Sequence, residues 1–169
     1  FPVIGENGMV VSTSRQASET GIEILKKGGN AVDAAVAVGF VLAVTSSGNG
    51  NIGGGGFMVA AMNNGPNFTI DHREKAPDSA HRDMFIDKSG EVISDMSLYS
   101  RSASGVPGTV DGLIKALVDH GSGEISLRQI LAPAIKLAEK GFLLSHYEAQ
   151  RFNYYNDFFK KNDAAAAIF

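Results

Sequence analysis

The spacing of apolar residues along the chain predicts a mainly helical protein. Residues 9–13 (MVVST) are typical of a short strand, and Thr13 with Gln16 has the spacing of a capping box that begins a helix. This helix carries one apolar stripe and ends near Lys27, because the two glycines that follow favour a stop.

The next predicted helix is apolar on nearly every side. Asn30 is its expected N-cap, with Asp33 three residues later, and the helix extends from residue 31 to about residue 44. A helix without a polar face has to be covered on most of its sides, so we expect it at the centre of the core.

One β-hairpin is predicted, over residues 57–62 and 67–71, because these segments flank the turn sequence NNGP at 63–66. Residues 78–104 are polar and irregular, with a turn at 88–90. Three helices follow: one from the GVPGT sequence at 105–109 to about 120, a short one capped by Ser126 and Gln129 that restarts at Pro133 and ends at Gly141, and one capped by Ser145 and Glu148 that extends to about 161.

These elements leave both edges of a two-stranded hairpin unpaired, although such edges normally need partners. The chain also ends on an apolar pair without a stop signal. We therefore expect residues 1–169 to be an incomplete domain of the α/β (α+β) class, mostly helices plus a β-hairpin, without an internal boundary.

Composition and charge exclude several classes of function. The net charge of -3, with lysines and arginines scattered along the chain, provides no basic face for nucleic acid. The absence of cysteine excludes disulfides, thiolate zinc sites and a cysteine nucleophile. The longest apolar run, at 34–44, is well short of the roughly twenty residues that a membrane span needs.

Four consecutive glycines at 53–56 precede the hairpin. With Gly48 and Gly50 they match the spacing of a dinucleotide fingerprint, but that motif needs a strand before the glycines and a helix after them, and the order here is reversed. A P-loop fails as well, because no Gly-Lys-Ser/Thr follows. Two interpretations remain: a tight passage between closely packed backbones, or a loop that borders an active site.

The candidate chemistry from single residues is sparse. The histidines (His72, His81, His120 and His146) lack metal-binding spacing, so we expect no metal and no cofactor. No serine lies in a recognisable nucleophile motif. Arg73, just past a predicted strand end, is either an incidental ion-pair partner of Asp71 or Glu74, or a group that binds a carboxylate.

Taken together, six segments in order resemble the γ-glutamyltranspeptidase family. They are GGNAVDAA at 28–35, GNIGGGGF at 50–57, DHREKAP at 71–77, DMF at 83–85, GVPGT at 105–109, and PAIKLA with GF at 133–138 and 141–142. The resemblance extends over nearly the whole chain.

This resemblance implies part of the αββα sandwich of the N-terminal-nucleophile hydrolases, made as a precursor that cleaves itself into a large and a small subunit. The chain would be the N-terminal part of the large subunit. The catalytic threonine would lie beyond residue 169, so the chain would contain no catalytic residue and would be inactive alone. Its partners would be the remainder of the large subunit and the small subunit.

The same resemblance implies a reaction and a location. The complete enzyme would cleave the γ-glutamyl amide of glutathione or a related compound and pass the acyl group, through a γ-glutamyl-threonine intermediate, to water, an amino acid or a peptide. We expect it in the periplasm or outside the cell. Arg73 would bind the α-carboxylate of the substrate, supported by Glu74, Asp71, Gly54 and Gly55, with Glu74 as a buried partner that orients Arg73.

Some features leave the specificity open. Residues 14–15 and 45–47 and His72 depart from the usual family pattern. Relatives that hydrolyse glutaryl-cephalosporins or process poly-γ-glutamate share much of it. A different class of protein, a non-catalytic binding or scaffold domain, also fits a chain without a nucleophile.

Overall fold

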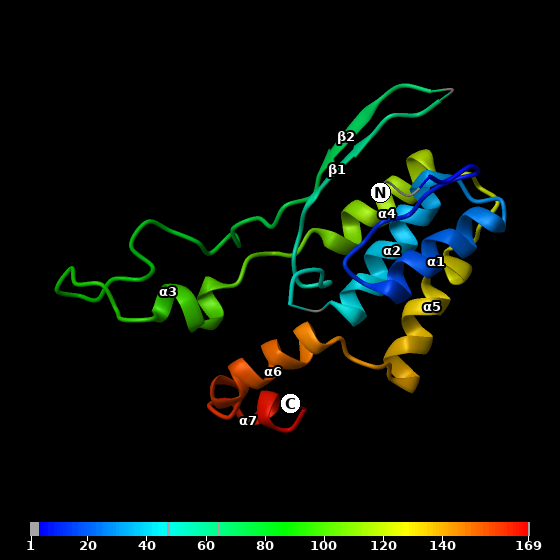
Figure 1. Ribbon diagram of the computed structural model, residues 1–169. Coiled ribbons are helices and arrows are strands. Elements are labelled where there is room, and N and C mark those ends of the chain that lie inside the picture. The colour runs from blue at the N-terminus through cyan, green and yellow to red at the C-terminus, as the bar shows by residue number, and fades with distance from the viewer. Residues whose placement is uncertain (1–3, 47, 64, 169) are drawn as a thin grey trace.

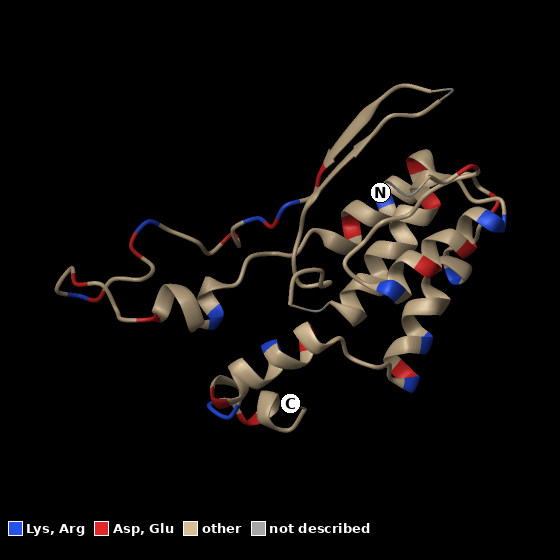
Figure 2. Cartoon of the chain, in the orientation of Figure 1, with Lys and Arg blue, Asp and Glu red and all other residues tan. Residues whose placement is uncertain are grey.

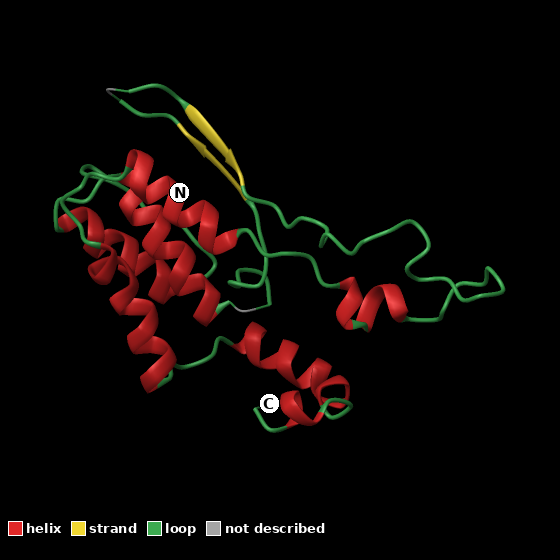
Figure 3. Ribbon diagram, turned by 180° about the vertical axis from the view of Figure 1, so that it is seen from behind, coloured by secondary structure: helices red, strands yellow, loops and turns green. Residues whose placement is uncertain are grey.

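The computed structural model describes residues 4–46, 48–63 and 65–168. Four helices, α1, α2, α4 and α5, gather in one body, and α6 and α7 lie apart from it. The hairpin stands away from this body, and the segment between the hairpin and α4, which contains α3, extends in another direction (Figures 1 and 3). The elements are α1 (Arg15–Lys26), α2 (Ala31–Thr45), β1 (Phe57–Ala60), β2 (Phe68–Asp71), α3 (Met96–Tyr99), η1 (Arg101–Ala103), α4 (Thr109–His120), α5 (Leu127–Lys140), α6 (His146–Phe159) and α7 (Asp163–Ala166). Within the described ranges, no helix is long and apolar enough to cross a membrane.

Helix α2 is the centre of the core, as its sequence predicts. Val36, Ala37 and Val41 are fully buried, and α1, α4 and α5 pack against the helix. A further side, with Val38 and Leu42, faces a cavity of about 500 Å³ that strand β1 and the N-terminal segment also line. Most of α2 is therefore covered.

The N-terminus of α2 also holds the connection between α4 and α5. Asn30 and Asp33 form the predicted capping box, in which Asn30 Oδ1 accepts from Asp33 N at 3.0 Å and Asp33 Oδ2 from Asn30 N at 2.8 Å. Asn30 Nδ2 donates to the carbonyl of His120 at 2.8 Å, and Asp33 Oδ2 accepts from Ser122 N at 3.0 Å. One capping pair thus joins segments about 90 residues apart in sequence.

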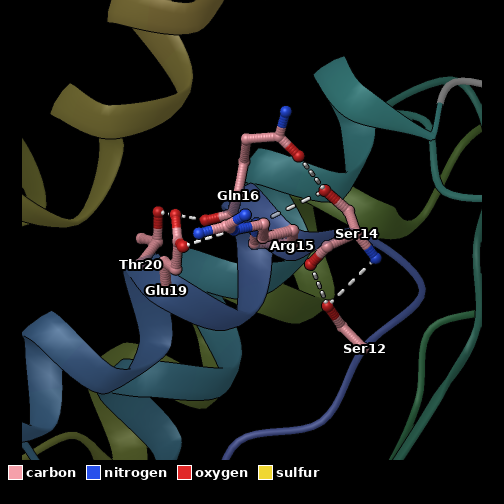
Figure 4. A network of polar contacts seen from close by, with 7 residues as sticks. Ser12, Ser14, Arg15, Gln16, Glu19 and Thr20 are labelled. Carbon is pink, nitrogen blue, oxygen red and sulfur yellow. Dashed lines mark hydrogen bonds and ion pairs between the residues drawn. The ribbon is translucent and has the colours of Figure 1, made fainter. Parts of the chain in front are cut away.

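The predicted start of α1 is wrong by one residue. Ser14, not Thr13, is the N-cap, because Ser14 Oγ accepts from Ala17 N at 3.4 Å. Ser14 Oγ also accepts from the buried Thr45 Oγ1 at 2.8 Å, which joins the start of α1 to the end of α2. Figure 4 shows the surrounding polar contacts, including Ser12 and Gln16.

The predicted strand at 9–13 is also wrong, because no described strand pairs with this segment. Without a ladder partner its alternating side chains do not form a sheet face, and Val11 remains 82% exposed.

The hairpin is confirmed with shorter strands. Phe57 pairs with Asp71 and Ala60 with Phe68 in an antiparallel register. Asn64, in the predicted turn, lies outside the described residues. Among those described, the sheet has only these two strands, so both edges are open as the sequence predicts. Phe68 stacks on His120, with ring centroids 3.6 Å apart, and this contact ties the hairpin to α4.

The second half differs from the prediction mainly at α5. Ser126 and Gln129 form the expected capping box, but the helix continues through Pro133 to Lys140 without a restart. Proline removes one backbone donor; burial of Ile130 and Ala134, on either side of it, against the core keeps the helix continuous.

The remaining predictions hold with small changes. The turn at 88–90 is present, and the segment 78–104 is irregular except for α3 and η1. Ser145 caps α6, which ends at Phe159 rather than near 161. The short α7 was not predicted.

Candidate functional site

Three segments meet at the base of the hairpin: the glycines at 54–56, residues 72–75 after β2, and residues 105–109 before α4 (Figure 1). Gly56 and His72 exchange two backbone hydrogen bonds of 3.3 and 3.0 Å, which continue the hairpin ladder by one pair. Lys75 and Val106 exchange two more, of 3.1 and 2.8 Å. The segment that carries Arg73 and Glu74 is therefore fixed on both sides by backbone.

Gly54 joins the third segment to the other two. Its carbonyl accepts hydrogen bonds from the backbone N–H groups of Gly108 and Thr109, both at 3.0 Å. These donors lie at the start of α4, where N–H groups have no partner within the helix, and Gly108 provides no side-chain cap. The glycine loop itself thus caps α4.

The glycines in this region are required by space. None of the described glycines at 53–56 has a positive φ. A Cβ at Gly55 would lie 2.5 Å from the carbonyl oxygen of His72, 2.8 Å from Glu74 N and 2.9 Å from Arg73 Cα. A Cβ at Gly108 would overlap the same carbonyl oxygen. Closely packed backbones, one of the two interpretations of the glycine stretch, are therefore present, and they surround Arg73.

The guanidinium of Arg73 is hydrogen-bonded through its Nε atom. Its Nε donates to Glu74 Oε2 at 2.9 Å, and its backbone N–H donates to Asp71 Oδ1 at 3.0 Å. Its guanidinium carbon lies 5.8 Å from the centre of the Phe57 ring. Among the residues that the structure describes, the two Nη nitrogens have no hydrogen-bond partner, and the side chain is 60% exposed. The ion pair with Glu74 therefore leaves the outer fork of the guanidinium accessible.

Glu74 pairs with Arg73 as expected but is not buried, since 33% of its side chain is exposed. It lies at the base of the hairpin beside Gly54 and Gly105, which carry no side chains to cover it. Its own backbone N–H has the largest effect and lowers the pKa of the Glu74 carboxyl. Desolvation opposes this effect, and the Arg73 guanidinium adds to it, so the pKa lies below its ordinary value. The ionised Glu74 thus forms an ion pair with Arg73.

His72 precedes Arg73 in the chain and packs against glycines. A Cβ at Gly112, in the first turn of α4, would overlap the His72 side chain, and a Cβ at Gly56 would lie 3.1 Å from its Cε1. His72 Nδ1 is buried and has no hydrogen-bond partner among the described residues. The imidazole therefore serves here as a packing group that spaces the hairpin from α4.

The charged residues of this region begin where the hairpin ends. The hairpin carries no Lys, Arg, Asp or Glu from Phe57 to Ile70, and charged residues begin at Asp71 (Figure 2). The described residues contain no group of three or more His, Asp or Glu side chains that could hold a metal ion. What the arrangement offers chemically is a forked cation on a fixed backbone, a geometry suited to a carboxylate.

Sequence reasoning did not foresee the contacts of Gly108 and Gly112 with the Arg73 segment. The GVPGT sequence at 105–109 was recognised only as a helix start and as part of a family pattern. The concentration of glycine on both sides of the hairpin was the available signal, but the pairing partner of each glycine follows only from the fold.

Comparison with known proteins gives consistent results. A family model described as Gamma-glutamyltranspeptidase matches residues 17–169. The glutathione hydrolase proenzyme of Pseudomonas sp. (strain A14) is 46% identical over 169 residues, and that of Escherichia coli (strain K12) is 51% identical over 144 residues. These matches cover 99% and 85% of this chain. More distant relatives are named acylase proenzymes.

Among solved structures, γ-glutamyltranspeptidase from Helicobacter pylori superposes with a TM-score of 0.91 and 44% identity, over 97% of this chain and 47% of that chain. The chain spans only 29% and 24% of the two glutathione hydrolase proenzymes. It therefore corresponds to part of a longer fold, in agreement with the open hairpin edges. On the family model, the identities and the superposition, this chain belongs to the γ-glutamyltranspeptidase family.

Proposed function

We propose that this chain is the N-terminal part of the large subunit of a γ-glutamyl-transferring or γ-glutamyl-hydrolysing enzyme, with Arg73 as the anchor for the substrate's α-carboxylate. The observation that carries the proposal is the outward fork of Arg73. Its Nε is occupied by Glu74 at 2.9 Å, and both Nη nitrogens are accessible at the base of the hairpin.

The anchor contributes to catalysis by position. A guanidinium binds a carboxylate through two parallel N–H···O bonds, which fixes both the distance and the rotation of the bound group. Holding the α-carboxylate places the γ-carbonyl at a fixed distance from Arg73, which turns an encounter in solution into a reaction between oriented groups. The backbone on either side of Arg73 is hydrogen-bonded, and this fixes the position from which the distance to the γ-carbonyl is set.

The chemical step would be carried out by the rest of the precursor. A threonine freed as the N-terminus of the small subunit would attack the γ-carbonyl with its own amine as base, and the acyl group would pass to water or to an amine acceptor. The remainder of the large subunit and the small subunit are therefore the proposed partners, glutathione is the proposed donor, and the periplasm or the extracellular space is the proposed location.

Substitution of Arg73 in the complete precursor tests the anchor. Loss of a charge-assisted pair of hydrogen bonds in Arg73→Ala is expected to raise KM for L-γ-glutamyl-p-nitroanilide about tenfold to a hundredfold. Arg73→Lys keeps the charge without the fork and is expected to recover part of the loss. Arg82→Ala is the matched control, because Arg82 is 96% exposed and lies in the irregular segment away from the site. Wild-type kinetics in Arg73→Ala would refute the assignment.

A glutaryl group is the competing substrate, because it also places a carboxylate at the far end of a carbonyl chain and some relatives are named acylases. Arg73 alone fits either group. The comparison that separates them is the kcat/KM for γ-glutamyl-p-nitroanilide against that for glutaryl-p-nitroanilide, and a higher value for the glutaryl compound would replace the proposed donor. A chain that binds neither compound in the complete protein would support the non-catalytic alternative.

A further inference from the structure

Helix α6 is separated from the helical body by a cavity of about 910 Å³. The end of α2, including Thr45, the end of α5, including Leu137, and α6 residues such as Phe152 line this cavity. The position of α6 is therefore not set by a continuous apolar core. On this helix, Arg151 extends to the beginning of the glycine loop.

Arg151 contacts the loop through its guanidinium. Its Nη2 donates to the carbonyl of Gly48 at 3.4 Å. With the amide of Asn49 oriented so that its oxygen faces the guanidinium, Nη1 donates to that oxygen at 3.0 Å. The guanidinium carbon lies 5.8 Å from the ring centre of Tyr147, one helical turn earlier. Two contacts to the loop and one to a residue of α6 thus hold the guanidinium.

The residue at position 48 is matched to Arg151. A Cβ on Gly48 would lie 2.5 Å from Nη2, 2.6 Å from Cζ and 2.7 Å from Nη1 of Arg151. Because the guanidinium is the far end of a flexible side chain, a methyl group at position 48 would displace it from the Gly48 carbonyl.

Two turns connect this contact to the site. Gly50 N donates to Ser46 O at 2.9 Å, and Gly54 N donates to Asn51 O at 3.2 Å. The carbonyl of Gly54 then caps α4, and a Cβ on Gly54 would lie 3.5 Å from Glu74 Oε1. A short loop with two hydrogen-bonded turns therefore links residues 48–49 to the backbone that holds Arg73.

We propose that Arg151 is a positioning residue: it fixes the glycine loop from α6 and so sets the geometry of the Arg73 anchor. This inference rests on the proposed function. It assigns to α6 a role in substrate binding without direct contact with the substrate.

Kinetics in the complete precursor give the first test. Arg151→Ala is expected to raise KM for γ-glutamyl-p-nitroanilide about threefold to tenfold, the effect of losing a partly exposed charged hydrogen bond. Because Arg151 does not touch the reacting groups, kcat is expected to stay within about twofold. Arg151→Lys should recover part of the KM change. The matched control is Lys160→Ala, because Lys160 pairs with Asp157 near the end of α6 at 2.9 Å.

A double-mutant cycle tests the contact with Gly48. Gly48→Ala displaces the guanidinium and is expected to reproduce the KM change of Arg151→Ala, whereas adding it to Arg151→Ala should have no further effect. Additive effects would overturn the inference, because they would mean that the two residues act independently.

Hydrogen exchange of the backbone amides at 48–55 gives a readout that needs no activity. Arg151→Ala is expected to speed exchange in this loop, and Lys160→Ala is not. Unchanged exchange in Arg151→Ala would overturn the inference whether or not the proposed reaction is correct. Faster exchange with unchanged KM would remove the role in substrate binding. Failure of the proposed function itself would be seen separately, as wild-type kinetics in Arg73→Ala.

Discussion

Arg73 Nε donates to Oε2 of its sequence neighbour Glu74 at 2.9 Å, so the guanidinium is held by its inner edge while its outer fork faces away from the pair. Neighbouring residues in an extended strand point to opposite faces. The bond forms here just past the end of β2, in the segment that is held between two backbone partners, Gly56 and Val106. The ion pair and the proposed anchor are thus compatible roles of one side chain.

Removal of the charge on Glu74 is expected to weaken substrate binding. In the complete precursor, Glu74→Gln keeps an oxygen for Arg73 Nε and should raise KM by about twofold to fivefold, while Glu74→Ala should raise it further. Arg82→Ala, at a side chain that is 96% exposed, is the control and should leave KM unchanged. Equal KM values in all of these variants would contradict an orienting role for Glu74.

The lowered pKa of Glu74 determines the pH range in which its charge contributes to substrate binding. Its own backbone N–H and the Arg73 guanidinium favour the ionised form, so the carboxylate stays charged until the pH falls below the ordinary glutamate value of about 4.3. The stabilisation that the ionised group adds is present above that value and is lost as pH falls through the lowered pKa. The ratio of KM in Glu74→Gln to KM in wild type should therefore be constant between pH 5 and pH 8, and a ratio that approaches one near pH 6 would contradict this reasoning.

Two adjacent glycines are expected to differ sharply in their tolerance of a methyl group. Gly55→Ala would place a Cβ 2.5 Å from the carbonyl of His72, whereas the nearest atoms to a Cβ on Gly54 lie at 3.5 Å. The first variant should lower the melting temperature of the precursor and raise KM, because backbone has to move beside Arg73. The second should behave like wild type in thermal unfolding. Equal tolerance of both substitutions would refute the spatial explanation of the glycine stretch.

Asp33 is expected to be the polar side chain on which the helical body depends most. It is fully buried and accepts from the backbone N–H groups of Asn30 and Ser122. Asp33→Ala leaves both donors without this partner, at a cost of about 1–3 kcal/mol each in the free energy of unfolding.

Asp33→Asn is the matched control for this substitution. It keeps an acceptor for both donors and places its NH₂ where Oδ1 has no partner among the described residues. Denaturant titration of both variants measures the difference. A loss in Asp33→Asn as large as in Asp33→Ala would show that the charge, rather than the two hydrogen bonds, is what matters.

The 169-residue chain by itself is expected to self-associate through its hairpin. Both strand edges are open among the described residues, and Phe57 and Val59, on one face, are 66% and 81% exposed. Size exclusion should show species larger than a monomer, and Val59→Lys should reduce them. Val118→Lys, at a helical position that is 76% exposed, is the control and should have no effect. A monomer at every concentration would contradict the prediction.

Much of the local structure followed from the sequence, because short-range signals determine it. The Asn30–Asp33 and Ser126–Gln129 boxes were predicted because a capping side chain and its backbone partner are close in sequence. The unbroken passage of α5 through Pro133 was missed, because it depends on how Ile130 and Ala134 pack against other helices. The strand at 9–13 was predicted wrongly because alternation cannot show whether a ladder partner exists.

For the site, the sequence determined its components: a family pattern, an arginine after a strand, and glycines on both sides of the hairpin. Only the tertiary structure decided what they do together. It placed Gly55 and Gly108 against the carbonyl of His72, and it turned Arg73 outward from Glu74. The physical reason is distance in sequence: a glycine reveals that space is needed, but the backbone that fills the space comes from a segment about 17 to 36 residues away and is fixed only when the chain folds.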